Sequence, residues 1–76
     1  MKPIPTNIPL GKYRHFKGGE YQLLAIARDS ENPDNFIAVY KALYGEGEVW
    51  TRPLDMFTQV ITREGKEIQR FTYCKE

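Results

Sequence analysis

The stretch VWTRPLDMF at residues 49–57 is the part of the sequence that decides the predicted fold. It contains the only Trp of the chain, and an Arg and a Pro follow shortly after it. Proline lacks the N–H that a strand interior donates, so we expect a strand that ends at Arg52. The apolar residues after it predict a single helical turn over 53–57. A strand, a proline-initiated turn and a second strand are typical of a corner in a small β-barrel.

The length and composition indicate one small globular domain. Seventy-six residues can bury only a marginal core, and a hydrophobic content of 41% is too high for a disordered chain. No apolar run reaches the roughly 18 residues that a membrane span needs, and the N-terminal residues lack a signal-peptide pattern. One Cys and one His cannot build an intrachain disulfide or a metal site. We therefore expect a cytoplasmic protein with no membrane contact, no metal and no cofactor.

Turn-forming residues at short intervals predict an all-β fold. Three prolines favour an extended arm over residues 1–10, which precedes a single domain over residues 11–76. The segments between turns, which we expect to be strands, are 11–16, 21–28, 36–44, 49–52, 58–62 and 68–73. The last of these is either a strand or a segment lying along the barrel. The spacing predicts a small antiparallel barrel of five to six strands with one short helical turn.

The expected core consists of apolar residues on the central strands and at the corner, namely Leu24, Ile26, Val39, Leu43, Phe57 and Val60. Both faces of the predicted strands 21–28 and 36–44 carry apolar groups. Alternation should leave one polar face on a half-exposed antiparallel strand. Either the arm and the C-terminal segment cover the second face, or one face displays Tyr rings to solvent.

Four ordered blocks of sequence resemble a known family. They are GKYRHFKGGEY at 11–21, VYKALYG at 39–45, WTRPLDMF at 50–57, and Gly65-Lys66 with Arg70-Phe71. From about residue 11 to 73 the chain resembles domain of unknown function family 1653, a family of short bacterial domains. The resemblance implies an SH3-like barrel and no established activity. Where the family often has a His after the Ala-Arg of the second strand, this chain has Asp29.

Charge is distributed unevenly along the chain. Residues 1–28 carry five basic and one acidic side chain, whereas residues 29–57 carry two basic and six acidic ones. The net charge of +1 lacks the strongly positive footprint of a dedicated nucleic-acid-binding protein. The basic segment either orients a partner or is neutralised by the acidic segment in the fold.

No catalytic residues are expected. His15, the only imidazole, lies on a predicted strand beside Tyr13 and Lys17, with no carboxylate nearby in sequence to orient it as a general base. A structural His bonded to the backbone is the competing interpretation. We therefore predict that the protein is not an enzyme.

Surface rings favour a binding function, because SH3-like barrels bind extended peptides or nucleic-acid strands through aromatic side chains. The candidate binding residues are Tyr13, His15, Lys17, Tyr40, Tyr44, Trp50 and Arg52, with Tyr21 and Arg14 as further candidates. Tyr40 and Tyr44 are expected to be partly exposed on one strand face, with Tyr13 and Trp50 approaching from neighbouring strands. Core packing is the competing interpretation for each ring, above all for Trp50.

A protein or extended-peptide partner is the first hypothesis for function. The alternative is a nucleic-acid-associated module that uses the basic N-terminal region, and a small-ligand sensor or enzyme accessory is the third. Counterion release makes nucleic-acid binding strongly salt-dependent, which separates the first two hypotheses. The sequence leaves the identity of the partner and the oligomeric state open.

Overall fold

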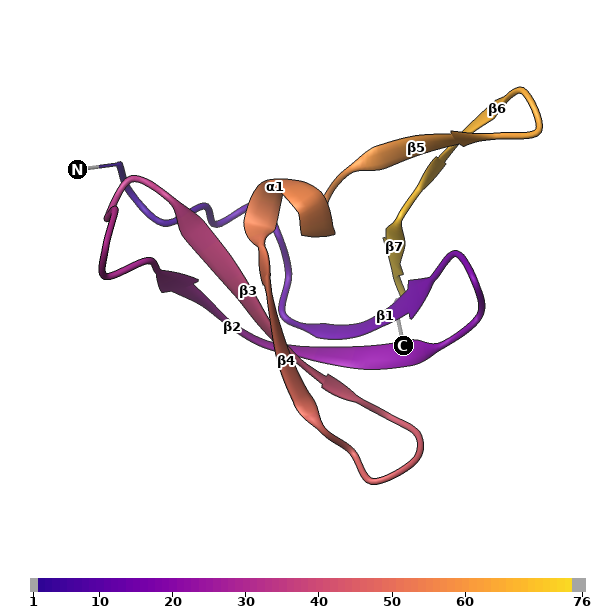
Figure 1. The fold of residues 1–76 in the computed structure, drawn as a ribbon, viewed down its shortest axis with the longest axis horizontal. Helices are drawn as coiled ribbons and strands as arrows, with labels where there is room; N and C mark the ends of the chain where they lie inside the picture. The colour runs from indigo at the N-terminus through magenta and orange to yellow at the C-terminus, as the bar shows by residue number, and fades with distance from the viewer. Residues whose placement is uncertain (1, 75–76) are drawn as a thin grey trace.

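The computed structural model describes residues 2–74, which form seven strands in two antiparallel sheets and one helical turn. The elements are β1 (Gly11–His15), β2 (Glu20–Arg28), β3 (Phe36–Ala42), β4 (Val49–Pro53), α1 (Leu54–Phe57), β5 (Val60–Arg63), β6 (Lys66–Gln69) and β7 (Phe71–Tyr73). One sheet has the order β4-β3-β2-β1-β7, and β5 and β6 form a separate hairpin that projects away from it (Figure 1). No helix within residues 2–74 is long and apolar enough to cross a membrane.

The all-β class with one short helical turn is confirmed, and the arrangement is consistent with an SH3-like barrel. The strand count exceeds the predicted five to six because the segment 68–73 is divided. The chain bends at Arg70, so Ile68 pairs with β5 whereas Tyr73 pairs with Tyr13 of β1. Residue 1 of the predicted arm and residues 75–76 of the predicted domain lie outside the described residues.

The Pro53 corner differs from the prediction by one residue. Pro53 is the last residue of β4, opposite Ile37 of β3, and not the first residue after the strand. This is possible because β4 is the edge strand of its sheet, so no second neighbour requires the missing N–H. The helical turn follows at once and buries Leu54 and Phe57, while the Thr58 hydroxyl donates to the Leu54 carbonyl over 3.1 Å.

A β-bulge in β2 changes which residues face the core. The register between β2 and β3 shifts between Leu23 and Ala25, so Leu24 is an additional residue on β2. As a result Ile26 packs against the core together with Leu23, although strict alternation would place the two on opposite faces. The buried cluster consists of Tyr13, Leu23, Ala38, Tyr40, Leu54, Phe57 and Phe71.

The predicted core was therefore partly wrong. Phe57 is buried, Ile26 packs against the core and Val39 is half-buried. Leu24, Leu43 and Val60 are instead 43%, 47% and 53% exposed. Leu24 lies at the bulge, Leu43 follows the last residue of β3, and Val60 belongs to the separate hairpin.

Aromatic rings form the centre of the core. The Phe57 ring stacks on Phe71 with centroids 4.2 Å apart and meets the Tyr13 ring edge-on at 5.2 Å. The Tyr13 hydroxyl donates to the carbonyl of Pro9 over 2.7 Å, and Ile8 packs against the same cluster. The N-terminal arm is therefore attached to the domain through its last residues.

We expect Gly65→Ala to lower the free energy of unfolding by about 1–2 kcal/mol, the usual cost of a left-handed conformation for a residue with a Cβ. Glu64 and Gly65 have φ values of 53° and 76°, which is typical of a type I′ hairpin turn. A Cβ at Gly65 meets open space, so the cost is conformational. Urea denaturation measures the loss, and Gly65→Asn should lose less because Asn tolerates this conformation. Equal losses in the two variants would contradict the assignment.

Candidate functional site

A shallow groove of about 230 Å³ lies across β2, β3 and β4. We call it the aromatic groove, and it is lined by Tyr21, Tyr40, Tyr44, Trp50 and Arg52. The pairing of β3 with β4 places Trp50 opposite Tyr40, and Arg52, two residues further along, shares the same strand face. The prediction that Trp50 and Arg52 share one face of this strand is confirmed.

Two tyrosines in the groove are held rigidly. The Tyr21 ring meets Tyr40 and Tyr44 edge-on, with centroids 5.4 and 5.5 Å away, and its hydroxyl is 2.5 Å from that of Tyr44. The hydrogen bond with Tyr44, followed by burial, raises the pKa of Tyr21 to about 12, so this phenol is protonated at neutral pH. A Cβ at Gly19 would come within 3.3 Å of both Tyr21 and Tyr44, so the β1–β2 turn packs closely behind the pair.

Exposure divides the groove into a floor and two exposed rings. Trp50 is 49% exposed and Tyr44 is 55% exposed, whereas Tyr40 is only 5% exposed. The prediction that Tyr40 is partly exposed was wrong, because Tyr21, Phe57 and Phe71 all pack around its ring. Tyr40 forms the floor of the groove, and its hydroxyl accepts a hydrogen bond of 3.2 Å from Nε of Arg52.

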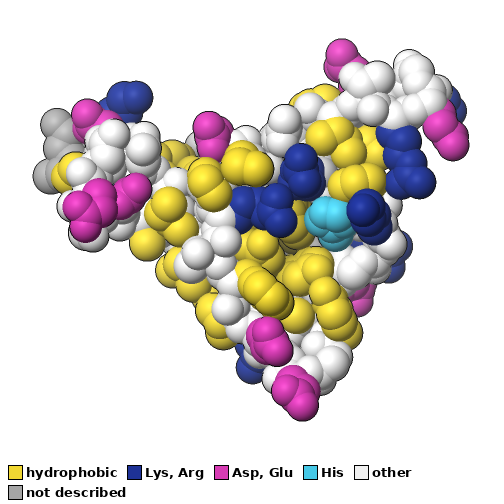
Figure 2. Space-filling model, viewed as in Figure 1, with side chains coloured by type: hydrophobic (Ala, Val, Ile, Leu, Met, Phe, Trp, Pro, Cys, Tyr) yellow, Lys and Arg dark blue, Asp and Glu magenta, His cyan; other side chains and the backbone are white. Residues whose placement is uncertain are grey.

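Positive side chains gather beside the groove around the single His. We call this set the basic cluster, and it consists of His15, Lys17, Arg52 and Arg70. Figure 2 shows Lys and Arg side chains on both sides of the cyan His, with hydrophobic side chains adjoining them. Both ion pairs found within residues 2–74 are made by Glu20, with Lys12 and Arg14, so neither involves the basic cluster.

His15 is held in one orientation within this cluster. Its Nδ1 accepts a hydrogen bond from the Lys17 backbone N–H over 3.1 Å, and its ring lies between those of Phe16 and Phe71. This contact requires the proton of the neutral ring to be on Nε2. Burial, and then the charges of Arg70, Arg52 and Lys17, lower the pKa of His15 below its ordinary value.

The stability of the domain should therefore fall as the pH drops below about 6.5, the ordinary pKa of His. Between that value and the lower pKa of folded His15, the unfolded chain binds the proton more readily, which favours unfolding. Below the folded pKa this contribution no longer changes with pH. NMR titration of the imidazole gives the pKa directly, and urea denaturation of a His15→Gln variant should show a flatter pH dependence. A His15 pKa above 6.5 would contradict the packing around the ring.

The remaining predicted site residues are divided between the core and the margins. Tyr13 was wrongly predicted to approach the groove, because it packs against Phe57 and Tyr73 in the core. Lys17 belongs to the basic cluster but lies over the Phe16 ring, outside the groove lining. Arg14 pairs with Glu20.

Arg70 is the component that sequence reasoning missed. It lies between β6 and β7, far in sequence from the rest of the basic cluster. Its only sequence signal was the Arg70-Phe71 pair within the family resemblance. Nη2 of Arg70 donates to Gln59 over 2.9 Å, whereas its buried Nε has no hydrogen-bond partner among residues 2–74.

The other end of the aromatic groove is acidic. A second hollow of about 250 Å³ adjoins it at the β3–β4 hairpin and shares Tyr44 and Trp50 as lining residues. Glu46 and Glu48 also line this hollow. The exposed rings therefore lie between Glu46 and Glu48 on one side and Arg52 of the basic cluster on the other.

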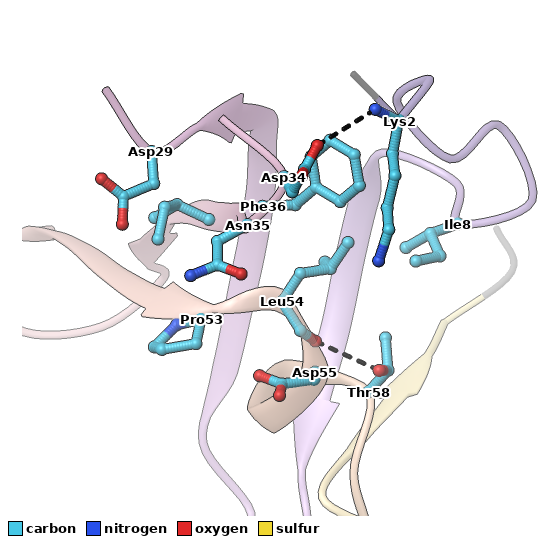
Figure 3. A pocket seen from close by; sticks show the side chains of 11 residues that line it. Lys2, Ile8, Asp29, Asp34, Asn35, Phe36, Pro53, Leu54, Asp55 and Thr58 are labelled. Carbon is cyan, nitrogen blue, oxygen red and sulfur yellow. Dashed lines mark hydrogen bonds between the residues drawn. The ribbon is translucent and has the colours of Figure 1, made fainter. Parts of the chain in front are cut away.

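A separate cavity of about 430 Å³ lies between the N-terminal arm, the β2–β3 loop and α1 (Figure 3). Three carboxylates line it, those of Asp29, Asp34 and Asp55. Two of them already bond the backbone, Asp29 to the Glu31 N–H and Asp34 to the Lys2 N–H. Within residues 2–74 no three His, Cys, Asp or Glu side chains are placed to hold a metal ion. Two of the three carboxylates of this cavity thus have structural partners, whereas the exposed rings of the aromatic groove have none that account for their exposure.

Comparisons with known proteins identify relatives but no activity. A family model described as "Protein of unknown function (DUF1653)" matches residues 11–73. The crystal structure of a protein belonging to DUF1653 from Bordetella bronchiseptica is similar, with 30% sequence identity and a TM-score of 0.80. The similarity covers 90% of this chain and 88% of that chain. Curated proteins give no match.

Proposed function

The chain belongs to the DUF1653 family, whose function is unknown, and we propose a function from the geometry of the chain itself. We propose that it is a binding module of the cytoplasm. It recognises a partner protein through an extended peptide segment of that partner. The observation that carries the proposal is the pair of exposed rings, Trp50 and Tyr44, above a floor of packed tyrosines. The Tyr44 ring is held by its contact and hydrogen bond with Tyr21, so it loses little side-chain entropy when a ligand binds.

The groove also suits an extended chain in shape. Tyr44 and Trp50 line both the aromatic groove and the adjoining hollow, so the two depressions form one continuous surface. Apolar contact with Tyr and Trp rings is a common way of binding extended and proline-containing peptides. The exposed Trp50 and Tyr44 supply apolar contact area, and the Arg52 side chain supplies hydrogen-bond donors beside it.

Two observations favour a peptide over a nucleic acid. Lys12 and Arg14 of the basic N-terminal region share Glu20 as an ion-pair partner, which offsets part of the positive charge of that region. The carboxylates of Glu46 and Glu48 border the exposed rings, where they would repel a phosphate backbone stacked along them. The alternative of nucleic-acid binding through the N-terminal region has less support.

A binding role is also better supported than catalysis. A general base needs a partner that accepts its other proton and favours its charged form. Nδ1 of His15 is occupied by the Lys17 N–H, and the charged groups around the ring are cations. We therefore propose that the protein is not an enzyme.

Selection from a random peptide library tests the proposal. The folded domain is immobilised and used to select peptides of about ten residues, long enough in extended form to pass both ends of the groove. Binding of each selected peptide is then measured by Trp50 fluorescence and amide chemical shifts, with a thymidine oligonucleotide as the competing probe. We expect peptides with a shared motif to perturb Tyr44 and Trp50 and to bind with a much weaker dependence on salt than the oligonucleotide. Steeply salt-dependent binding of the oligonucleotide at this surface, without peptide binding, would contradict the proposal.

A further inference from the structure

We propose that the peptide recognised by the aromatic groove carries an acidic side chain, whose carboxylate docks between Arg52, Arg70 and His15. This inference rests on the proposed function, since it specifies the chemistry of the peptide. It assigns to the basic cluster a binding role that the apolar contact of the rings does not explain.

The first argument is that the cations of the cluster lack a carboxylate partner. Within residues 2–74 neither Arg52 nor Arg70 forms an ion pair. Arg70 lies beside His15, because its carbonyl accepts a hydrogen bond from the Phe16 N–H over 2.9 Å and the next residue, Phe71, pairs with His15. Arg52 lies on the same side, since it bonds the Tyr40 hydroxyl and the Tyr40 ring contacts Phe71. Like charges gathered without a counterion repel one another, so their arrangement costs free energy in the unbound domain. A bound anion would remove this cost.

The second argument is the availability of hydrogen-bond donors. Arg52 uses Nε to bond Tyr40, and Arg70 uses Nη2 to bond Gln59. These bonds orient both guanidinium groups, and within residues 2–74 the terminal nitrogens of Arg52 and Nη1 of Arg70 donate to no protein acceptor. The proton that neutral His15 carries on Nε2 adds a further donor. Oriented guanidinium groups are the usual partners of carboxylates in binding sites.

The third argument is the polarity of the groove, which selects the type of anion. Glu46 and Glu48 lie at the opposite end from Arg52, with Trp50 and Tyr44 between them. A nucleic-acid strand, whose negative charge is evenly spaced, would be attracted at the basic end of the groove and repelled at the acidic end. A peptide with one acidic residue matches the basic end, and a basic residue further along it would match the acidic end.

Matched peptides provide the test. In a peptide selected on the domain, with amidated and acetylated ends, its Asp or Glu is replaced by Asn or Gln. We expect this change to weaken binding about tenfold or more, as for loss of a charged hydrogen-bonded partner. In the Arg52→Gln and Arg70→Gln domains the same change in the peptide should weaken binding less than in the unaltered domain, because one partner of the carboxylate is absent, and in the double variant by less than about twofold. The His15 pKa should rise when the acidic peptide binds and not when its amide counterpart binds.

Arg14→Gln is the matched control. It removes the same charge from β1, but Arg14 pairs with Glu20 and stands on the opposite strand face from His15. The Arg14→Gln domain should retain the full difference in affinity between the acidic peptide and its amide counterpart. Amide spectra of all the Arg variants report whether each remains folded.

The outcomes separate the two proposals. Selected peptides that bind the groove without a shared acidic residue, or that bind unchanged after its replacement, would overturn the acidic-peptide inference and leave the proposed function standing. If Arg14→Gln and Arg52→Gln reduce the preference for the acidic peptide equally, the inference is overturned as well, because the preference then depends only on the net charge of the domain. A thymidine oligonucleotide that binds this face while no peptide does would overturn both.

Discussion

Replacement of Phe57 by Ala is expected to unfold most of the protein at room temperature. The Phe57 side chain is 1% exposed and lies among the rings of Tyr13, Tyr40 and Phe71. Removing a fully buried Phe costs about 3–5 kcal/mol, from lost burial and from the cavity left behind. A core of this size supplies only about 3–5 kcal/mol of net stability. Near-ultraviolet circular dichroism and urea denaturation should therefore show a largely unfolded chain.

Met56→Ala is the control for this prediction. Met56 belongs to the same helical turn, but it is 42% exposed. Its replacement tests whether α1 itself, and not the ring of Phe57, is the sensitive feature. We expect a loss below about 1 kcal/mol, as for most surface substitutions. A folded, cooperatively unfolding Phe57→Ala variant would show that the aromatic cluster contributes much less than its burial indicates.

The sequence predicted the strands well because turn residues are local signals. Paired glycines, which allow positive φ, the turn-forming residues at 29–35 and the fixed φ of Pro53 each favour a turn whatever the rest of the chain does. The division at Arg70 had no such signal. It arises because Phe71 and Tyr73 pair with β1, more than fifty residues away in sequence, instead of continuing along β5.

The core was harder to predict because one additional residue in β2 reverses which of the following side chains face inward. The bulge at Leu24 moves Ile26 onto the face of Leu23, and nothing in the residue types around it indicates this. Tyr rings were also misjudged. Their hydroxyls made exposure plausible, yet Tyr13 and Tyr40 are buried because Pro9 and Arg52 satisfy those hydroxyls.

The candidate site shows the same division between local and distant information. Trp50 and Arg52 were recognised as sharing one face because they are two residues apart on a strand. His15, Lys17 and Arg52 were predicted as binding residues, but their gathering with Arg70 was not, since it depends on bringing β1, β4 and the segment between β6 and β7 together. The basic cluster, which supplies the charged part of the proposed recognition, thus exists only because of tertiary packing.

Trp50→Ala is expected to abolish most peptide binding while leaving the domain folded. The ring is 49% exposed, so its removal costs part of one cross-strand pair with Tyr40, on the order of 1 kcal/mol or less. Binding should fall about thirtyfold, because a Trp at the centre of an interface contributes about 2 kcal/mol or more. Titration calorimetry with a selected peptide measures the binding loss, and urea denaturation measures the stability.

Val49→Ala is the control that separates the loss of the Trp50 ring from a disturbance of strand β4. Val49 is 56% exposed and precedes Trp50, so its side chain lies on the opposite face of β4. If the groove is the binding site, Val49→Ala should bind the peptide like the unaltered domain. If both variants lose binding equally, the loss reflects a disturbed edge strand, and the ring has no special role. If Trp50→Ala instead unfolds the domain, Trp50 is structural and the aromatic groove loses its main support as a recognition surface.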